Sequence, residues 1–249
     1  MKELRDDIII GRNPVIEALK SGRDIEKLYI CKGAEGSAGK IMAMAREKGI
    51  PVHCEEKQVV DKLAEGNHQC VVAFVSAHRY SEIEDMIALA DKRGEKPFIL
   101  LLDGIEDPHN LGAIIRTAEA AGAHGIVIPK RRAAGISYIA AKASAGASEY
   151  MLCAKVPNIP QAIEKLKGMG LWIGACETGG ELYSETDLKG AIGLVLGSEG
   201  AGIGRLVKEK CDFTLSIPMK GKINSLNASN AAAVIMYEVR RQRDGKPIL

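Results

Sequence analysis

The chain has 249 residues, enough for one large domain or two smaller ones, and its 46% hydrophobic and 27% charged residues are typical of globular proteins rather than disordered chains. No uncharged run is long enough to span a membrane, so we expect no membrane partner. The formal net charge of +2 is too small to indicate nucleic-acid binding by itself, which leaves that role to local basic loops.

The six cysteines lie far apart and include no CxxC pair, which is typical of reduced thiols and gives no indication of a metal site. Asp6 and Asp7 stand directly before the short apolar run 8–10, so the first residues lack the layout of a secretory signal peptide. We therefore expect a cytoplasmic protein without bound metal.

Residues 1–76 alternate short apolar runs with helical patterns. Asn13 and Pro14 are predicted to cap and start the first helix, and Gly22 to end it. The alternation predicts a small N-terminal α/β/α sandwich, and it contains no catalytic constellation. The expected strands are 8–10, 28–31, 51–54 and 70–76, and the expected helices are 13–22, 38–48 and 56–65.

Residues 77–96 differ from the segments on either side. Ser81 and Glu84 match an S-x-x-E capping box, and Ile83, Ile87 and Ala90 form a helical stripe before RGEKP breaks the pattern. We interpret this segment as a linker that carries one helix. An ordinary helix within a continuous domain fits the same pattern equally well.

A second domain, 97–249, begins with the unbroken apolar strand 98–102. Asn110 is the expected N-cap of the helix that follows, and Arg116 falls away from its apolar face. The order of strands and helices predicts a parallel sheet covered on both faces. Further expected strands are 125–129, 171–176, 192–196 and 213–217, and further helices are 139–147, 159–167 and 231–243.

Two turns near the end of the chain follow buried strands. The turn 197–200 follows strand 192–196, and Ile217-Pro218-Met219 leads toward SLNASN, which opens the last helix. Ligands of open α/β sheets bind at the carboxyl ends of strands, so we expect a cofactor pocket here. The glycines do not match G-x-G-x-x-G, no acidic residue follows to hold a ribose diol, and no Walker loop is present, which disfavours a dinucleotide.

Five polar side chains stand on loops or helix starts around this expected pocket: Asn110, Arg116, Glu199, Ser225 and Asn227. Taken one at a time, each has an ordinary structural role as well. The asparagines and the serine are residue types that cap helices, the arginine can be a solvated charge, and the glutamate can satisfy amides of the glycine turn. Their joint occurrence indicates a site.

Three stretches carry a resemblance to a known family: DPHNLGAIIRTAEAAG, LVLGSEGAGIGRLV and IPMKGKINSLNASNAAAVIMYE. They resemble the three motifs of the SpoU, or TrmH, family of RNA ribose 2′-O-methyltransferases. The N-terminal GRNPVIEAL and NHQCVVA further resemble its RlmB-like branch, in which an RNA-binding domain precedes the catalytic domain. The resemblance covers nearly the whole chain.

The resemblance implies S-adenosylmethionine as cofactor, a C-terminal SPOUT domain with a trefoil knot, and a homodimer that completes the active site. Rules of chain topology alone would exclude such a knot. By resemblance, the backbones of Gly197, Ile217 and Leu226 contact the cofactor, with Gly200, Pro218 and Met219 beside them. The five polar side chains named above match the catalytic and motif residues of the family.

The expected chemistry is methylation of a ribose hydroxyl, which is a poor nucleophile and must lose its proton as the new bond forms. The family's arginine has been proposed as the base, but a guanidinium is almost always protonated. We expect Arg116 to hold the target phosphate and stabilise developing charge, while a phosphate oxygen or water takes the proton. Glu199 would orient Arg116 or Asn110. His109 is interpreted as a loop residue.

Basic residues near the pocket are candidate phosphate contacts, with Lys220 and Lys222 favoured because their loop joins two motifs. The others are Lys130, Arg131 and Arg132. In the first domain, Arg12, Asn13, His68 and Gln69 are RNA contacts by resemblance only. The chain departs from the family at Cys70, where glycine is usual, and at Ala228 and Asn230, where β-branched apolar residues are common.

We therefore expect a two-domain enzyme that methylates a ribose 2′-oxygen, at a guanosine of large-subunit (23S) ribosomal RNA. Transfer RNA is the alternative substrate. A noncatalytic RNA-binding factor of ribosome assembly with the same fold is the alternative from another class, although Asn110, Arg116 and Glu199 are all present. The partners expected are RNA and a second copy of the chain, and no DNA.

Overall fold

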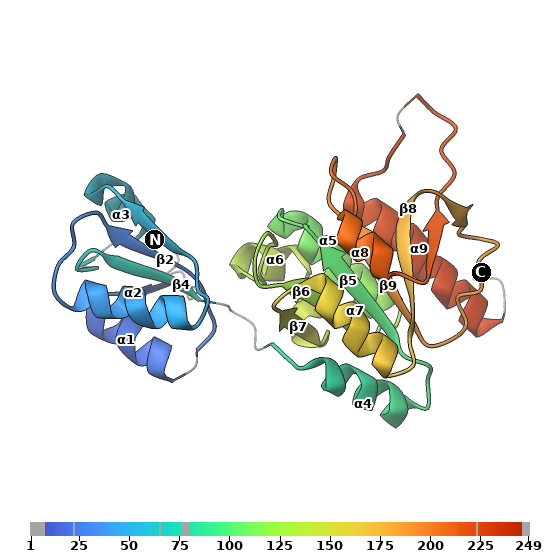
Figure 1. The fold of residues 1–249 in the computed structure, drawn as a ribbon, viewed down its shortest axis with the longest axis horizontal. Helices are drawn as coiled ribbons and strands as arrows, with labels where there is room; N and C mark the ends of the chain where they lie inside the picture. Colours follow the sequence, from blue (N-terminus) through green and yellow to red (C-terminus); the bar gives the residue numbers. More distant parts are fainter. Residues whose placement is uncertain (1–7, 22, 65, 76–79, 223, 246–249) are drawn as a thin grey trace. The chain divides into compact units, whose positions relative to one another are not determined.

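The computed structural model describes residues 8–21, 23–64, 66–75, 80–222 and 224–245. The chain forms two compact units, residues 1–79 and 80–249 (Figure 1). The division falls within the segment 77–96 that the sequence suggested as a linker.

The N-terminal unit is a four-stranded sheet with helices on both faces (Figure 1). Its strands lie in the order β1 (Ile8–Ile10), β4 (Val71–Val75), β2 (Ile25–Cys31) and β3 (Val52–Glu55); only β2 and β3 are parallel. Helices α1 (Arg12–Lys20) and α2 (Ser37–Glu47) pack on one face, and the short α3 (Lys57–Leu63) packs on the other. The predicted α/β/α sandwich is confirmed.

The first helix begins one residue earlier than predicted. Its N-cap is Gly11, and Asn13 lies inside the first turn without capping it. Gly11 has a φ of 92°, a conformation that glycine adopts without steric cost. Gly22, the predicted end of this helix, lies outside the described residues.

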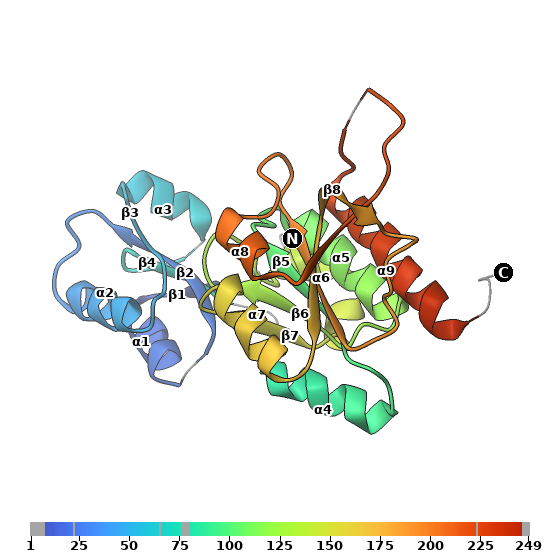
Figure 2. The same ribbon diagram turned by 45° about the vertical axis from the view of Figure 1, so that its right-hand side comes forward.

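The second unit is a six-stranded parallel sheet between two layers of helices (Figure 2). The strand order is β10 (Phe213–Ser216), β8 (Trp172–Leu182), β9 (Ile192–Gly197), β5 (Phe98–Asp103), β6 (Gly125–Pro129) and β7 (Cys153–Val156). One face carries α5 (Pro108–Ala120), α6 (Tyr138–Ala143) and α9 (Ala228–Asp244); the other carries α4 (Ile83–Arg93), α7 (Ile159–Gly168) and α8 (Arg205–Lys210).

Strand β5 is buried on both faces of the sheet, which makes its position predictable from sequence. Leu100 and Leu102 point into the core under α5 and α9, whereas Ile99 and Leu101 point into the core under α4 and α7. A strand buried on both faces is apolar at every position, which is the pattern read from 98–102. Strand β7 and helix α8 were missed because four and six residues are too few for a periodic signal.

Helix α4 belongs to the second unit instead of standing alone in a linker. Its Met86 is fully buried and packs where a side chain of Gly125 would otherwise lie. The capping box of this helix also differs from the prediction. Glu82 is the N-cap and pairs with Asp85, so Ser81 and Glu84 do not form the box.

The start of α5 corrects a second predicted cap. Asp107 is the N-cap, its side chain accepts a hydrogen bond from the backbone N–H of His109, and Pro108 occupies the first helical position. Asn110 therefore lies in the first turn with its side chain free of capping. At α9 the N-cap is Asn227, whose Oδ1 accepts from the backbone N–H groups of Ser229 and Asn230.

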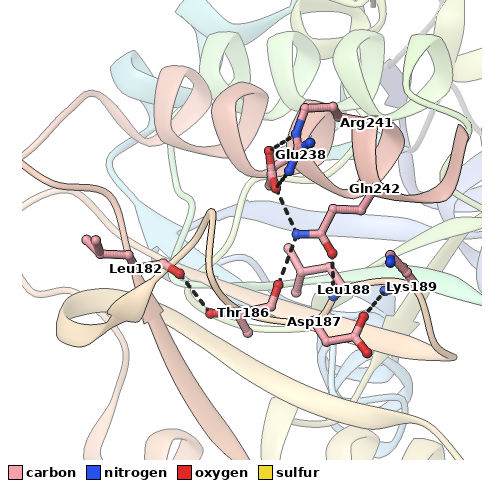
Figure 3. A network of polar contacts seen from close by, with 8 residues as sticks. All are labelled: Leu182, Thr186, Asp187, Leu188, Lys189, Glu238, Arg241 and Gln242. Atoms are coloured by element: carbon pink, nitrogen blue, oxygen red, sulfur yellow. Dashed lines mark hydrogen bonds and ion pairs between the residues drawn. The ribbon is translucent and has the colours of Figure 1, made fainter. Parts of the chain in front are cut away.

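The connection between β8 and β9 is fixed to α9 by a polar network (Figure 3). The side-chain amide of Gln242 donates to the carbonyl of Thr186 at 2.9 Å and to Glu238 at 2.8 Å, and its oxygen accepts from the N–H of Leu188. Arg241 pairs with the buried Glu238 at 2.7 Å and lowers the pKa of its carboxyl. This network fastens the connection between β8 and β9 to α9.

The apolar face of α9 is core. Ala232, Ile235, Met236 and Val239 are buried against the sheet and α5. This face is therefore already covered within one chain. Among the described residues, no helix is long and apolar enough to cross a membrane.

Candidate active site

A pocket of about 340 Å³ lies where the carboxyl ends of β8, β9 and β10 meet the start of α9. Its walls come from the glycine turn after β9, the loop after β10 and the first turns of α9. Of the predicted cofactor contacts, Gly197, Gly200, Ile217, Met219 and Leu226 line it. Pro218 does not line it, and lies between two residues that do.

The glycine turn is tight and presents its backbone to this pocket. The N–H of Ser198 donates to the carbonyl of Gly202 at 3.2 Å, and the N–H of Gly202 donates back at 3.0 Å. A side chain on Gly197 would collide with the backbone of Gly202, and Gly200 has a φ of 88°. Glycine is therefore required at these positions, and a pocket built this way suits a ligand that is held by main-chain groups.

Sequence reasoning missed one acidic residue of the pocket, Glu177. Strand β8 pairs with β10 up to Ala175 and resumes at Glu181, so residues 176–180 leave the ladder with β10, and residues 176–178 line the pocket. Among the described residues, Glu177 makes one ion pair, between its buried Oε2 and Nζ of Lys208 at 3.2 Å, and its Oε1 accepts no hydrogen bond. The two glycines that follow, at 179 and 180, were the available signal.

A second, larger cleft of about 730 Å³ lies beside the pocket, at the carboxyl ends of β5 and β6 and the start of α7. Arg131 and Arg132 line it, and Lys130 does not. The two hollows share one wall, made by the glycine turn and the start of α9. The residues that line both are Ser198, Glu199, Ala201, Gly202 and Ala228.

Glu199 is the centre of the polar contacts in this wall. Its Oε1 accepts hydrogen bonds from the side-chain amide of Asn110 at 3.0 Å, from the side-chain amide of Asn227, and from the N–H of Ala228 at 3.2 Å. Asn227 also donates to Oδ1 of Asn110 at 3.0 Å. Three of the five predicted catalytic side chains are thus brought together, and the contact of Glu199 is with Asn110 and not with Arg116.

The other two predicted catalytic residues lie differently. Ser225 is exposed and lines the smaller pocket. Arg116 is exposed on α5, lines neither hollow, and makes no hydrogen bond or ion pair with a described residue. Six helical positions separate it from Asn110, which turns it roughly 120° away around the helix axis. The chain by itself does not bring Arg116 to Glu199.

The loop after β10 carries Lys220 and Lys222, both exposed. Asn230, whose role the sequence left open, is exposed in the first turn of α9. Cys176 lines the smaller pocket, and burial raises the pKa of its thiol, so the sulfur stays neutral. Within the described residues, no three His, Cys, Asp or Glu side chains are grouped so as to hold a metal ion.

In the N-terminal unit, two predicted RNA contacts are joined to each other. The backbone N–H of Arg12 donates to Oε1 of Gln69 at 3.1 Å, and its Nε donates to the Gln69 carbonyl at 3.1 Å. Asn13 is exposed beside them. His68 is buried, with one ring nitrogen bonded to Asp61 at 2.8 Å and the other accepting from the N–H of Cys70, so no ring nitrogen is left for RNA.

Two family models match the chain. The SpoU rRNA Methylase family matches residues 97–237, and a model for RNA 2′-O ribose methyltransferase substrate binding matches residues 8–81. Among curated relatives, YacO of Bacillus subtilis (strain 168), provisionally named a TrmH family tRNA/rRNA methyltransferase, is 47% identical over 240 residues, which are 96% of each chain.

Solved structures agree with the family models. The SpoU methyltransferase AviRb from Streptomyces viridochromogenes, in complex with the cofactor AdoMet, matches with a TM-score of 0.62 and 25% identity over 96% of this chain and 91% of that one. An AdoMet-bound rRNA methyltransferase from Sinorhizobium meliloti matches with a TM-score of 0.58 and 28% identity over 94% and 86%.

The chain belongs to the SpoU family of RNA methyltransferases, and its second unit has the SPOUT fold. Its cofactor is S-adenosylmethionine and its substrate is RNA, either transfer or ribosomal. The smaller pocket fits this cofactor, because two turns and a helix start offer main-chain groups there and Glu177 offers a carboxylate.

Proposed function

We propose that the protein transfers a methyl group from S-adenosylmethionine to the 2′-oxygen of a ribose in RNA, at a guanosine of 23S ribosomal RNA. The observation that carries this proposal is the position of Glu199, in the wall between the two hollows. Its Oε1 holds the amides of Asn110 and Asn227, while its Oε2 accepts no hydrogen bond from a described residue. A transfer between two substrates needs two sites that meet at a polar group.

We assign the smaller pocket to the methyl donor. Main-chain groups of Gly197, Ile217 and Leu226 hold the donor's adenosyl part, with Gly200 and Met219 completing the walls. Unpaired backbone groups at strand ends suit this task because a nucleoside offers both donors and acceptors at its edges. When bound, the donor supplies an electrophilic methyl group on a positively charged sulfur.

We assign the larger cleft to the target nucleotide. The free Oε2 of Glu199 accepts the hydrogen bond of the incoming 2′-hydroxyl and orients its oxygen toward the donor pocket. Asn110 fixes the carboxylate in that orientation. Arg131 and Arg132 line the same cleft and bind flanking phosphates, joined by Lys220 and Lys222 from the loop after β10. A phosphate oxygen of the RNA or a water takes the proton.

The remaining motif residue, Arg116, implies a second subunit. It is exposed and lines neither hollow of its own chain. We propose that the enzyme is a homodimer in which Arg116 of each chain reaches the cleft of the other, where its planar fork holds the target phosphate and stabilises the developing alkoxide.

Mixed dimers test this arrangement. Arg116→Ala and Glu199→Gln are each expected to abolish most activity alone. Mixing and reassembling the two should restore about a quarter of wild-type activity, because half of the dimers are hybrids that carry one intact site. No recovery in verified hybrids would contradict an arginine supplied by the second chain.

Replacing Arg116 with Lys tests whether the planar guanidinium fork is needed. Near-normal turnover of this variant would show that a point charge suffices.

Mapping of 2′-O-methyl positions in total RNA from cells with and without the gene tests the substrate. We expect one position to be lost, at a guanosine of 23S ribosomal RNA; the arrangement of a substrate-binding unit before the catalytic unit, as in the RlmB-like branch, supports that target. A position lost from transfer RNA instead would favour the alternative substrate, which the names of the relatives include.

Calorimetry with S-adenosylmethionine tests the alternative from another class. If no binding is found, a noncatalytic RNA-binding factor of ribosome assembly is favoured.

A further inference from the structure

One half of a sheet face in the N-terminal unit carries a row of aromatic side chains. Helix α3 covers the half of this face that contains Cys31 and Val72, through Val60. On the other half, contacts join four residues from three adjacent strands: Lys27 and Tyr29 on β2, His53 on β3 and Phe74 on β4. We call these four residues the aromatic row.

The rings of the aromatic row follow one another across the strands. Phe74 meets Tyr29 edge to face, with centroids 5.6 Å apart, and Tyr29 is stacked on His53 at 4.9 Å with an angle of 20° between the rings. Strand β3 lies at the edge of the sheet, and His53 is exposed. The outer face of the His53 ring therefore has no neighbouring strand beside it, so a further flat group can continue the stack.

A positive charge accompanies the rings. The ammonium group of Lys27 lies 4.9 Å from the centroid of Phe74 and 5.7 Å from that of Tyr29, within the range of a cation–π contact. Stacked rings with one open end and an adjacent cation match the chemistry of an unpaired nucleotide, which offers an aromatic base and a phosphate. A protein partner would be better served by a broad apolar surface than by a single exposed ring.

We propose that the aromatic row is an RNA-binding surface, on which one unpaired base of the substrate stacks against the free face of His53 and the adjoining phosphate lies near Lys27. The proposal rests on the proposed function, since it gives the N-terminal unit a substrate that this unit reads. The match of residues 8–81 to a substrate-binding model supports an RNA role for the unit.

This surface is separate from the Arg12–Gln69 contacts. Gln69 precedes the first residue of β4, whereas Phe74 lies near the end of that strand. The three strand positions from Val71 to Phe74 alone correspond to about 10 Å. The two surfaces together select a short single-stranded segment rather than a duplex, whose bases are already stacked.

The test uses the full-length protein and a short, fluorescently labelled single-stranded RNA of mixed sequence, with a duplex of the same sequence as a second probe. His53→Ala is expected to weaken binding of the single strand about tenfold and to leave duplex binding unchanged. His53→Phe, which keeps a ring, should stay within about twofold of wild type. Val59→Ala, an exposed apolar residue of the same unit, is the control and should bind as wild type does.

A second variant, Tyr29→Leu, removes the ring that stacks on His53 and should weaken binding of the single-stranded probe about as much as His53→Ala does. Unchanged single-strand binding by His53→Ala and Tyr29→Leu overturns the proposal, and it is also the result expected if the surface serves a protein. Equal losses for single strand and duplex overturn it too, because stacking of an unpaired base cannot act on a duplex.

These outcomes are distinct from a failure of the proposed function, because the binding assay needs no methyl donor. If no RNA is methylated but His53→Ala binds the single-stranded probe more weakly than wild type does, the enzyme assignment fails and the proposal for the aromatic row is supported. If methylation occurs, His53→Ala should raise the KM for RNA about tenfold and leave kcat unchanged. Methylation with an unchanged KM overturns the aromatic row alone.

Discussion

The side-chain amide of Asn110 donates a hydrogen bond to Oε1 of Glu199 at 3.0 Å, across 89 positions of the sequence. The same oxygen accepts from Asn227 and from the N–H of Ala228. One carboxylate therefore joins the first turn of α5, the glycine turn after β9 and the start of α9. Because the glycine turn and the start of α9 also form the wall between the two hollows, the site depends on this one acceptor.

Glu199→Gln should lower kcat about a hundredfold. The amide has the same shape, but it removes the negative charge that faces the cleft. It also offers the three donors, on Asn110, Asn227 and Ala228, either a weaker acceptor or an N–H group that repels them. Donor affinity, measured by calorimetry, should change little, since main-chain groups dominate that pocket. Glu185→Gln, an exposed residue outside both hollows, is the matched control. Turnover of Glu199→Gln close to wild type would remove Glu199 from the chemistry.

Glu177→Gln should weaken S-adenosylmethionine binding about tenfold, as expected when a charge-assisted hydrogen bond is lost. The Glu177 carboxylate lines the donor pocket. Lys208 pairs with its Oε2 at 3.2 Å, whereas its Oε1 accepts no hydrogen bond from a described residue, so Oε1 is the atom offered to a hydroxyl or ammonium group of the donor. Calorimetry measures the change directly. Glu181→Gln, on the same strand but outside the pocket, should bind as wild type does; an equal affinity for Glu177→Gln would assign the carboxylate to Lys208 alone.

The predictable parts of the fold are those in which burial dictates residue type over several positions. Strand β5 is apolar throughout because it is buried on both faces, and its prediction needed no tertiary information. The cap of α5 is ambiguous in the sequence because Asp107 and Asn110 are both capping types; Pro108, which favours the first helical position, is the residue that distinguishes them.

The candidate site was predictable only in part, for a related reason. Asn110, Glu199 and Asn227 stand in motifs, and the fold joins them. Glu177 was missed because it lies in a stretch that leaves the β8 ladder, and a strand pattern gives no information on such departures. Arg116 lies away from the hollows of its own chain, so its place depends on contacts that one chain does not contain.

Cys70→Gly should give a more stable protein than Cys70→Ala, by about 1 kcal/mol, because Cys70 has a φ of 64° and a Cβ in this region costs free energy. Comparing glycine with alanine cancels the loss of the thiol. Unfolding in urea followed by circular dichroism measures the difference. At Lys48, where φ is −85°, the alanine variant should instead be more stable than the glycine variant. Equal stability of the two Cys70 variants would show that the backbone relaxes.

Gly112→Ala should destabilise the second unit by about 1–3 kcal/mol. The added Cβ would lie 2.5 Å from the carbonyl of Ala140 and 2.5 Å from Cβ of Ala143, so α5 and α6 would have to separate. Gly168→Ala is the control, since nothing lies within 4 Å of its Cβ position in α7. Urea unfolding followed by fluorescence of Trp172, the one tryptophan of the sequence, reports this unit. Equal urea midpoints for Gly112→Ala and Gly168→Ala would show that the contact between α5 and α6 can adjust to the added methyl group.

The second unit should lose stability as the pH falls below about 6.5, because of His124. This ring is fully buried; its Nδ1 accepts from the N–H of Phe98 at 3.0 Å, so its Nε2 carries the proton that faces Glu95 at 2.9 Å. Burial lowers the pKa of His124, and the nearby Glu95 opposes that shift only in part. A second proton would have to sit on Nδ1, where it would face the N–H of Phe98.

The sign of the pH dependence follows from this lowered pKa. Between the folded and unfolded pKa values the unfolded chain binds more protons, so stability is fully present above about pH 6.5 and falls on acidification, by at most about 1.4 kcal/mol per pH unit. Urea unfolding at pH 7 and pH 5, followed by Trp172 fluorescence at fixed protein concentration, measures it. His124→Gln keeps a polar side chain without a titrating group and should lose less between the two pH values. A drop in the variant as large as that of the wild type would assign the acid sensitivity to other groups.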